Sequence, residues 1–363
     1  KYNYPATGSV SDWYTADPGA VFDVDLVYAS GSQYTRLDYR INGGTWRNVW
    51  SGSQYASYTV DWSVVWGDVS EGDNVVDLRA VDSAGNVATH TYASGVTGFL
   101  IRVDDTPPSF DYNTPATGAP TVWYGADPGA AIDIDLLYAT GSPLARFDYQ
   151  IGAGAWNNIW NGSQSSSYTA DWQVNWAALA EGENEISIRG LDEMGNTATD
   201  AFSTGAAGFT FRKDTVAPII NYNTPATGAP TVWYNADPGA VIDVDLEFSS
   251  NSPIVRFDYQ LNGGGWTNIW NGSQSSTYNT DWQVNWAATN EGDNQVDVRG
   301  LDSAGNVATH TFSTGAAGFT FRRDTRVPVI KYNYPATGSA TTWYTADPGA
   351  VFDVDLVYAS GSQ

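Results

Sequence analysis

Residues 1–8, KYNYPATG, return as DYNTPATG from Asp111, as NYNTPATG from Asn221 and again as KYNYPATG from Lys331. Each copy begins 110 residues after the one before it, without insertion or deletion. A fixed internal period decides the architecture of a chain, and this period is much longer than one layer of a solenoid. The sequence therefore predicts separate domains in tandem. The fourth copy is partial, and we expect the chain to be a window on a longer array.

Within each repeat, apolar and polar residues alternate, which is the pattern of half-buried β-strands. In AVFDVDLVYA, Phe22, Val24 and Leu26 fall on one face and the aspartates between them fall on the other. Asp-Pro-Gly and Asn-Gly-Gly motifs supply tight turns between such stretches. About seven short strands in a repeat of this length predict a sandwich of two β-sheets.

The composition excludes several classes of protein. The 363 residues include 40 acidic and 16 basic side chains, a net charge of −24, and no cysteine. Nucleic-acid binding and docking on an anionic membrane both need basic surfaces, so we predict neither partner. Without cysteine there are no disulfides, thiolate nucleophiles or zinc-thiolate sites. A hydrophobic content of 42% excludes a disordered chain, and we expect no membrane insertion in this segment.

Three segments carry a resemblance to a known family. VSEGDNVVDLRAVDSAGNVA from Val69, with its copies from Leu179 and Thr289, resembles the penultimate strand and final hairpin of bacterial immunoglobulin-like repeats. LDYRINGGTW from Leu37 resembles their middle strand, and KDTVAPII from Lys213 resembles their Asp-Thr linkers. The resemblance implies an all-β chain of tandem immunoglobulin-like β-sandwich domains in a linear array. The expected domains are 1–105, 106–215, 216–325 and an incomplete fourth, 326–363, with first strands only.

In that family such repeats form stalks of surface adhesins and extracellular fibres. The resemblance thus implies a non-enzymatic, extracellular or cell-surface protein, most simply of bacterial origin, that acts as a rigid spacer. The implied partners are neighbouring copies of the same repeat, in a longer array or a polymer. In such a polymer, the strands after Lys331 would complete a neighbouring sandwich by strand addition.

Acidic residues are expected to gather where one immunoglobulin-like domain meets the next. Oxygen ligands at a flexible joint suit Ca²⁺, so calcium is the predicted cofactor, and it would stiffen the junctions. The candidate ligands are Asp17, Glu71, Asp73, Asp104 and Asp105 facing Asp192 and Asn196, and then Asp127, Glu181, Glu183 and Asp214 facing Asp302 and Asn306. The alternative is that they are solvated turn residues, because Asp and Asn favour turns and none has the spacing of a recognised calcium loop.

No set of residues shared by the repeats forms a catalytic site. Asp23 and Asp25 have a spacing along a strand that overlaps the carboxylate separation of glycosidases, but an open sheet face offers no cleft. We interpret them as part of a solubilising outer face. Arg79 is expected to pair with Asp38 across neighbouring strands. His90 and His310 share a phase at which the second repeat has Asp200, which excludes a common histidine-based mechanism.

Tryptophan suggests the alternative function. Two tryptophans per repeat are predicted to lie on one sheet face, where exposed rings could stack on cell-surface glycans or contact another subunit. These candidates are Trp46, Trp50, Trp156, Trp160, Trp266 and Trp270. A carbohydrate-binding array built on these pairs is thus the rival to a structural stalk. The structural interpretation is that the rings cap an open end of the core, as Trp62 and Trp66 are expected to fill it.

Overall fold

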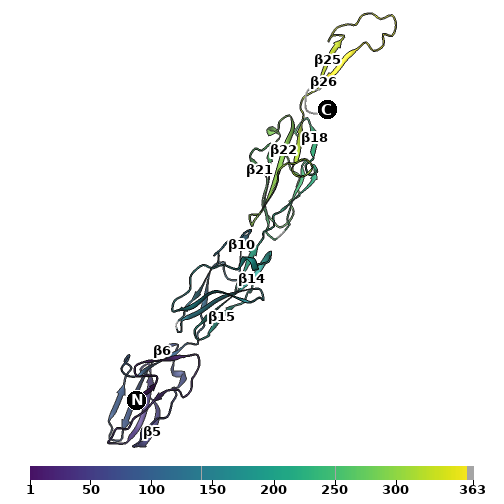
Figure 1. The fold of residues 1–363 in the computed structure, drawn as a ribbon. Coiled ribbons are helices and arrows are strands. Elements are labelled where there is room, and N and C mark those ends of the chain that lie inside the picture. Colours follow the sequence, from purple (N-terminus) through teal and green to yellow (C-terminus); the bar gives the residue numbers. More distant parts are fainter. Residues whose placement is uncertain (140, 250, 358–363) are drawn as a thin grey trace. The chain divides into compact units, whose positions relative to one another are not determined.

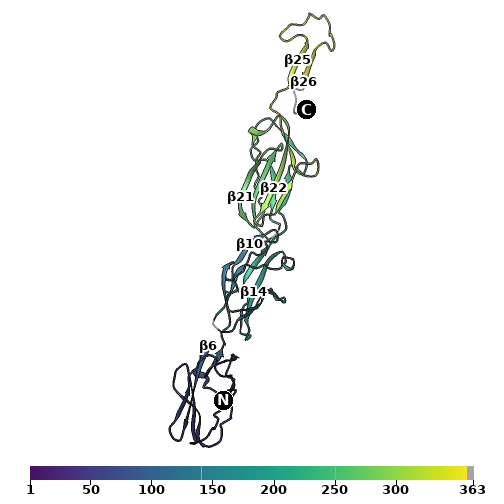
Figure 2. The same cartoon turned by 60° about the vertical axis from the view of Figure 1, so that its left-hand side comes forward.

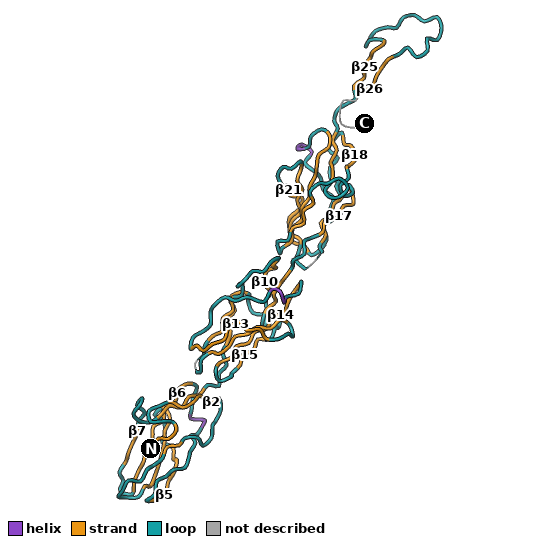
Figure 3. Tube along the Cα trace, viewed as in Figure 1, coloured by secondary structure: helices purple, strands orange, loops and turns teal. Residues whose placement is uncertain are grey.

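The computed structural model describes residues 1–139, 141–249 and 251–357. The chain is all-β (Figure 1), and immunoglobulin-like β-sandwich units recur in it with a period of 110 residues, as the sequence predicts. Figure 3 shows strands joined by loops, and the helical residues of the described ranges are confined to short 3-10 turns. The last six residues of the expected fourth domain, 358–363, lie outside the described residues.

The first repeat builds one six-stranded and one two-stranded sheet. Its elements are β1 (Tyr2–Tyr4), β2 (Val10–Tyr14), β3 (Asp23–Val24), β4 (Tyr34–Ile41), β5 (Arg47–Gln54), the 3-10 turn η1 (Trp66–Asp68), β6 (Gly72–Asp82), β7 (Val87–His90) and β8 (Phe99–Val103). The large sheet has the order β2-β8-β6-β4-β5, with β7 also paired to β6, and the small sheet pairs β1 with β3. The β2–β8 pair is parallel, and the other pairs are antiparallel.

The second and third repeats have the same strand order. The second consists of β9 (Ser109–Thr114), β10 (Pro120–Tyr124), β11 (Asp133–Leu137), β12 (Leu144–Ile151), β13 (Trp156–Gln164), η2 (Trp176–Ala178), β14 (Gly182–Asp192), β15 (Thr197–Asp200) and β16 (Phe209–Lys213). The third consists of β17 (Ile219–Thr224), β18 (Pro230–Tyr234), β19 (Asp243–Glu247), β20 (Ile254–Leu261), β21 (Trp266–Gln274), η3 (Trp286–Ala288), β22 (Gly292–Asp302), β23 (Val307–His310) and β24 (Phe319–Arg323). Figure 2 labels β21 and β22 in the six-stranded sheet of the third repeat.

The alternating side chains seen in the sequence build the core between the two sheets. In the first repeat, Phe22 and Val24 meet Tyr39, Val76 and Phe99 of the large sheet, and all five are buried. The segment around Trp62 closes the same core, because its backbone pairs with Phe22 and its ring stacks on Tyr39. Trp62 is buried and Trp66 is half-buried, so the prediction that both contribute to the core is confirmed.

One methyl group distinguishes the first core from the other two. Gly190 and Gly300 lie under the side chains of Leu136 and Leu246, and a Cβ at either glycine would overlap the leucine Cδ1. The first repeat has Ala80 at this position, so Leu26 cannot pack in the same way. Leu26 is only half-buried, whereas Leu136 and Leu246 are fully buried.

The chain separates into two compact units. The first unit contains Lys1–Thr121, Pro128–Ala178 and Asn184–Phe211; the second contains Val122–Asp127, Leu179–Glu183 and the described residues from Arg212 onward. Within the second unit, β25 (Val329–Tyr334) and β26 (Asp353–Val357) pair as the small sheet does elsewhere. Their apolar side chains, such as Ile330 and Leu356, are largely exposed.

Candidate functional site: the junctions between repeats

The first junction lies within the first unit and centres on Asp104, directly after β8. This residue is buried, and its backbone N–H donates to the Tyr14 carbonyl. Two groups of the second repeat bond to it: the Ser142 N–H donates to Asp104 Oδ2 at 2.7 Å, and Asn196 Nδ2 donates to the Asp104 carbonyl at 3.0 Å. Gly141 is required here, because a Cβ on it would lie 2.6 Å from Asp104 Cγ. The two repeats are therefore joined by direct hydrogen bonds.

The second junction lies within the second unit and repeats this geometry. The Ser252 N–H donates to Asp214 Oδ2 at 2.8 Å, and Asn306 Nδ2 donates to the Asp214 carbonyl at 2.6 Å. Asp214 is fully buried, and its N–H donates to the Tyr124 carbonyl. The same three hydrogen bonds thus recur 110 residues later.

A second aspartate holds each asparagine in place. Asp192 accepts the backbone N–H of Asn196 on Oδ1 and its side-chain N–H on Oδ2, each at 2.9 Å. Burial raises the pKa of Asp192, and the nearby charge of Asp104 adds to the rise. The pKa of Asp302 is raised in the same way, by burial and by the charge of Asp214. The pKa of Asp82, the equivalent residue of the first repeat, is instead lowered to about 2 by hydrogen bonds from Ser32 and Asn86.

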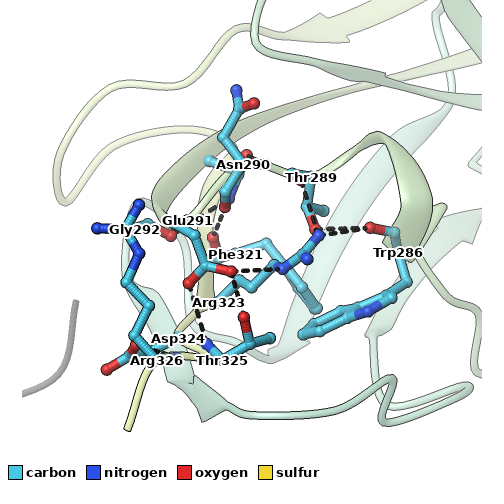
Figure 4. Close-up of polar contacts among 11 residues, drawn as sticks. Trp286, Thr289, Asn290, Glu291, Gly292, Phe321, Arg323, Asp324, Thr325 and Arg326 are labelled. Carbon is cyan, nitrogen blue, oxygen red and sulfur yellow. Dashed lines mark hydrogen bonds and ion pairs between the residues drawn. The ribbon is translucent and has the colours of Figure 1, made fainter. Parts of the chain in front are cut away.

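In the third repeat, Glu291 lies directly before β22, and its negative charge is offset by hydrogen-bond donors and by an arginine (Figure 4). Glu291 Oε1 accepts the Thr325 hydroxyl at 2.6 Å, its Oε2 accepts the Thr325 N–H at 2.9 Å, and Arg323 Nε lies 3.2 Å away. The Thr325 hydrogen bonds lower the pKa of Glu291, and the Arg323 charge lowers it further. In the second repeat, Thr215 bonds Glu181 similarly and Lys213 Nζ lies 3.8 Å away.

The first repeat lacks both of these partners. Val103 replaces the basic residue and Asp105 replaces the threonine. Glu71 Oε2 accepts the Asp105 N–H at 3.2 Å, but within the described ranges its buried Oε1 has no hydrogen-bond partner. Burial, together with the carboxylates of Asp104 and Asp105, raises the pKa of Glu71 to about 7. The first junction therefore carries an uncompensated carboxylate.

The predicted calcium ligands are gathered only in part. Glu71, Asp104 and Asp105 lie together, and Asp104 lies beside Asp192 and Asn196. Others are engaged locally: Asp17 accepts the Gly19 N–H of its own turn, Asp73 pairs with Arg102, and Glu183 pairs with Arg212. Among residues 1–139, 141–249 and 251–357, no group of three or more His, Cys, Asp or Glu side chains is arranged to hold a metal ion. Calcium binding stays a prediction.

The prediction that the paired tryptophans share a sheet face is wrong. In the third repeat, Asp258 pairs with Asn268 but Phe257 pairs with Trp270, so Ile269 is an extra residue in β21. This β-bulge reverses the alternation and turns Trp270 toward the core, where it packs. The same shift occurs in β5 and β13.

Trp46 lies on the outer face, where its ring is covered. The Arg79 guanidinium sits 4.5 Å from the ring centroid, and Arg40 lies at 4.8 Å. Arg79 also pairs with Asp38 at 2.7 Å, which confirms that predicted pair. Asp38 is fully buried, and burial alone would raise its pKa, but hydrogen bonds from Arg36 and Arg79 outweigh burial and lower it. Trp156 and Trp266 lie under Arg189 and Arg299 in the same way.

The other groups considered for catalysis have structural partners. Asn3 Nδ2 donates to both Asp23 and Asp25 at 2.9 Å, and the His90 ring is stacked on Tyr2 and bonded to its hydroxyl. The sequence analysis missed the buried amide of Asn74, which bonds the carbonyls of Ser70 and Ile101. It also missed Ser142 at the junction. Both recur at the 110-residue period, and that recurrence was the available signal.

No protein-family model matches the sequence, and no curated protein matches it. Solved structures with similar folds include fibronectin(III)-like modules of Clostridium thermocellum CbhA, at 14% identity and a TM-score of 0.26, covering 59% of this chain and 93% of that one. A tetra-tandem repeat from the extending region of a large adhesion protein has 13% identity and a TM-score of 0.28, covering 89% and 76%. Mouse protocadherin-24 EC1–3 has 12% identity and a TM-score of 0.35, covering 87% and 96%.

None of the helices in the described part of the chain has the length and apolar character needed to cross a bilayer.

Proposed function

We propose that this chain is a structural spacer of an extracellular fibre or adhesin stalk, without catalytic activity, that holds successive repeats in a fixed arrangement. The observation that carries the proposal is the repeated junction. Asp104 and Asp214 each accept a serine N–H and an asparagine amide from the following repeat. A device that recurs at the period of the chain serves the array as a whole, whereas a binding or catalytic site can stand alone in one repeat.

The burial of the junction groups supports the same proposal. Asp104 is 1% exposed and Asp214 is fully buried, so their hydrogen bonds are protected from water. Removing one partner would leave a buried polar group without a partner, which costs about 1–3 kcal/mol. These buried hydrogen bonds therefore add to the resistance that the linker alone offers to opening of each junction.

We further propose the domain limits 1–105, 106–215 and 216–325, with residues 326–363 as the start of a fourth domain. Pulling the full chain from both ends by force spectroscopy tests the limits and the mechanical role together. Three unfolding events are expected, each releasing on the order of 35 nm, because an extended residue spans about 3.5 Å. A single cooperative event would contradict the domain limits, and unfolding without resolvable force would contradict the spacer function.

Calcium at the first junction is the finer part of the proposal. Glu71, Asp104 and Asp105 bring carboxylates together there, whereas Lys213 and Arg323 supply a cation beside the equivalent glutamates. A bound Ca²⁺ would supply the missing positive charge. It would stiffen a junction that is otherwise weakened by repulsion.

The alternative of a carbohydrate-binding array on the tryptophan pairs is not favoured. In each repeat, an arginine covers the ring on the outer face, and the β-bulge turns the second ring toward the core. A pair on opposite faces cannot stack on one sugar chain. The proposed partners are therefore neighbouring copies of the repeat.

A further inference from the structure

The third repeat has a groove of about 380 Å³ beside η3, within the second unit. Two of its lining residues are aromatic: Tyr259 is buried, and its hydroxyl accepts the Asn285 N–H at 2.8 Å. Trp286 is half-buried beside it, with its ring held by the Arg323 guanidinium at 4.6 Å and by the Phe321 ring (Figure 4). Contacts within the repeat thus hold both aromatic side chains in place without a ligand.

The rim of the groove is polar and almost uncharged. Thr267 and Gln283 are exposed, and neither side chain has a hydrogen-bond partner in the described part of the chain. Asn285 Oδ1 accepts the Ala287 N–H, which leaves the NH₂ group of the Asn285 side chain to donate to a ligand. Asp237 is the one charged residue among those lining the groove. Hydrogen-bond donors and acceptors therefore line the groove together with the two aromatic side chains.

The residues at the equivalent positions differ in the first repeat. There Arg47 replaces Thr267 and Asp68 replaces Ala288, and the two form a bidentate pair with both N–O distances at 2.8 Å. Tyr39, the equivalent of Tyr259, is buried in the first repeat as well. Ser63 and Val65 stand where Gln283 and Asn285 stand. The first repeat thus carries an ion pair here and lacks the amide side chains of Gln283 and Asn285.

We infer that this groove of the third repeat binds a neutral saccharide. Sugar rings offer apolar C–H faces that rest on aromatic rings, and hydroxyls that donate and accept at once, which amide and hydroxyl side chains match. The lining residues include no cation for an anionic sugar. The inference goes beyond the spacer function and uses none of the Trp266–Trp270 pair.

The test uses the full chain labelled with ¹⁵N-tryptophan, and cellohexaose, xylohexaose and maltohexaose as probes. At least one probe should shift the Trp286 indole signal saturably at millimolar concentration. The double variant T267R/A288D, which copies the first repeat, should weaken that response at least tenfold. The matched variant R47T/D68A removes the ion pair of the first repeat but leaves Ser63 and Val65, and its Trp66 signal should not respond.

Two outcomes overturn the inference: no shift of Trp286 with any probe, or an unchanged shift in T267R/A288D. If T267R/A288D fails to fold, T267A/Q283A serves instead, because both side chains are exposed and unbonded. That variant should also weaken the response, and an unchanged response would equally overturn the inference. None of these outcomes bears on the junctions, so the spacer function is tested separately.

Discussion

Replacing Asp105 by Thr should stabilise the first repeat and reduce its sensitivity to pH. Thr215 and Thr325 donate their hydroxyls to Oε1 of the equivalent glutamates at 2.7 and 2.6 Å. Glu71 Oε1 is buried without such a donor and faces carboxylates instead. The substitution supplies the hydrogen bond and removes one of the negative charges.

The magnitude follows from the pKa of Glu71. A rise from 4.5 to about 7 means that the folded state binds this proton more tightly than the unfolded state. The free energy of unfolding therefore falls as pH rises from about 4.5 to 7, by at most about 3 kcal/mol. Because solvent screens this partly exposed carboxyl, we expect about 1 kcal/mol. D105T should recover that amount at pH 8, or roughly 4 °C in melting temperature, and little at pH 4.

Carboxyl ¹³C chemical shifts in a chain labelled at its seven glutamates measure the pKa directly, and calorimetry at pH 4 and pH 8 measures the stability. E71Q is the control, since it removes the titrating group and should also abolish the pH dependence. The reciprocal variant T215D should create a similar dependence in the second repeat. A Glu71 pKa near 4.5 in the unaltered chain, or a D105T variant no more stable at pH 8, would refute the reasoning.

Three further predictions concern packing, a buried amide and metal binding. G190A should cost about 1–3 kcal/mol by urea unfolding because its methyl overlaps Leu136, whereas A80G should not show this steric cost; equal losses would contradict the packing account. N294A should cost about 2–4 kcal/mol, because its amide is fully buried and bonds the carbonyls of Asn290 and Phe321; a loss below about 0.5 kcal/mol would contradict its role. Calcium, but not magnesium, should raise the melting temperature at fixed ionic strength, and E71Q should reduce the effect; no rise with calcium would end the metal proposal.

The sequence predicted the sandwich because period and alternation are local features. The spacing of residues such as Phe22 and Val24 is enough to predict that they face the core, and the turn motifs mark where the strands end. The topology implied by the immunoglobulin-like resemblance also put Asp104 opposite Asn196, the contact that the structure places at the junction.

Other features depend on register or on contacts remote in sequence. One extra residue at Ile269 reverses the face of Trp270, and nothing in the alternation of β21 marks a bulge. The role of Gly190 requires knowledge that Leu136 packs above it. The bond from the Ser142 N–H belongs to the backbone, so the recurrence of serine at this phase does not reveal which group accepts it.

The most direct test of the spacer function is the distance distribution between the first two repeats. The chain has no cysteine, so T45C and A153C place single spin labels at exposed turns of the full chain. We predict a narrow distribution that broadens in N196A, which loses the bond to the Asp104 carbonyl. N86A is the matched control, because the Asn86 amide bonds only Asp82 within its own hairpin, and it should leave the distribution narrow. A broad distribution in the unaltered chain, or one that N196A does not change, would contradict the account.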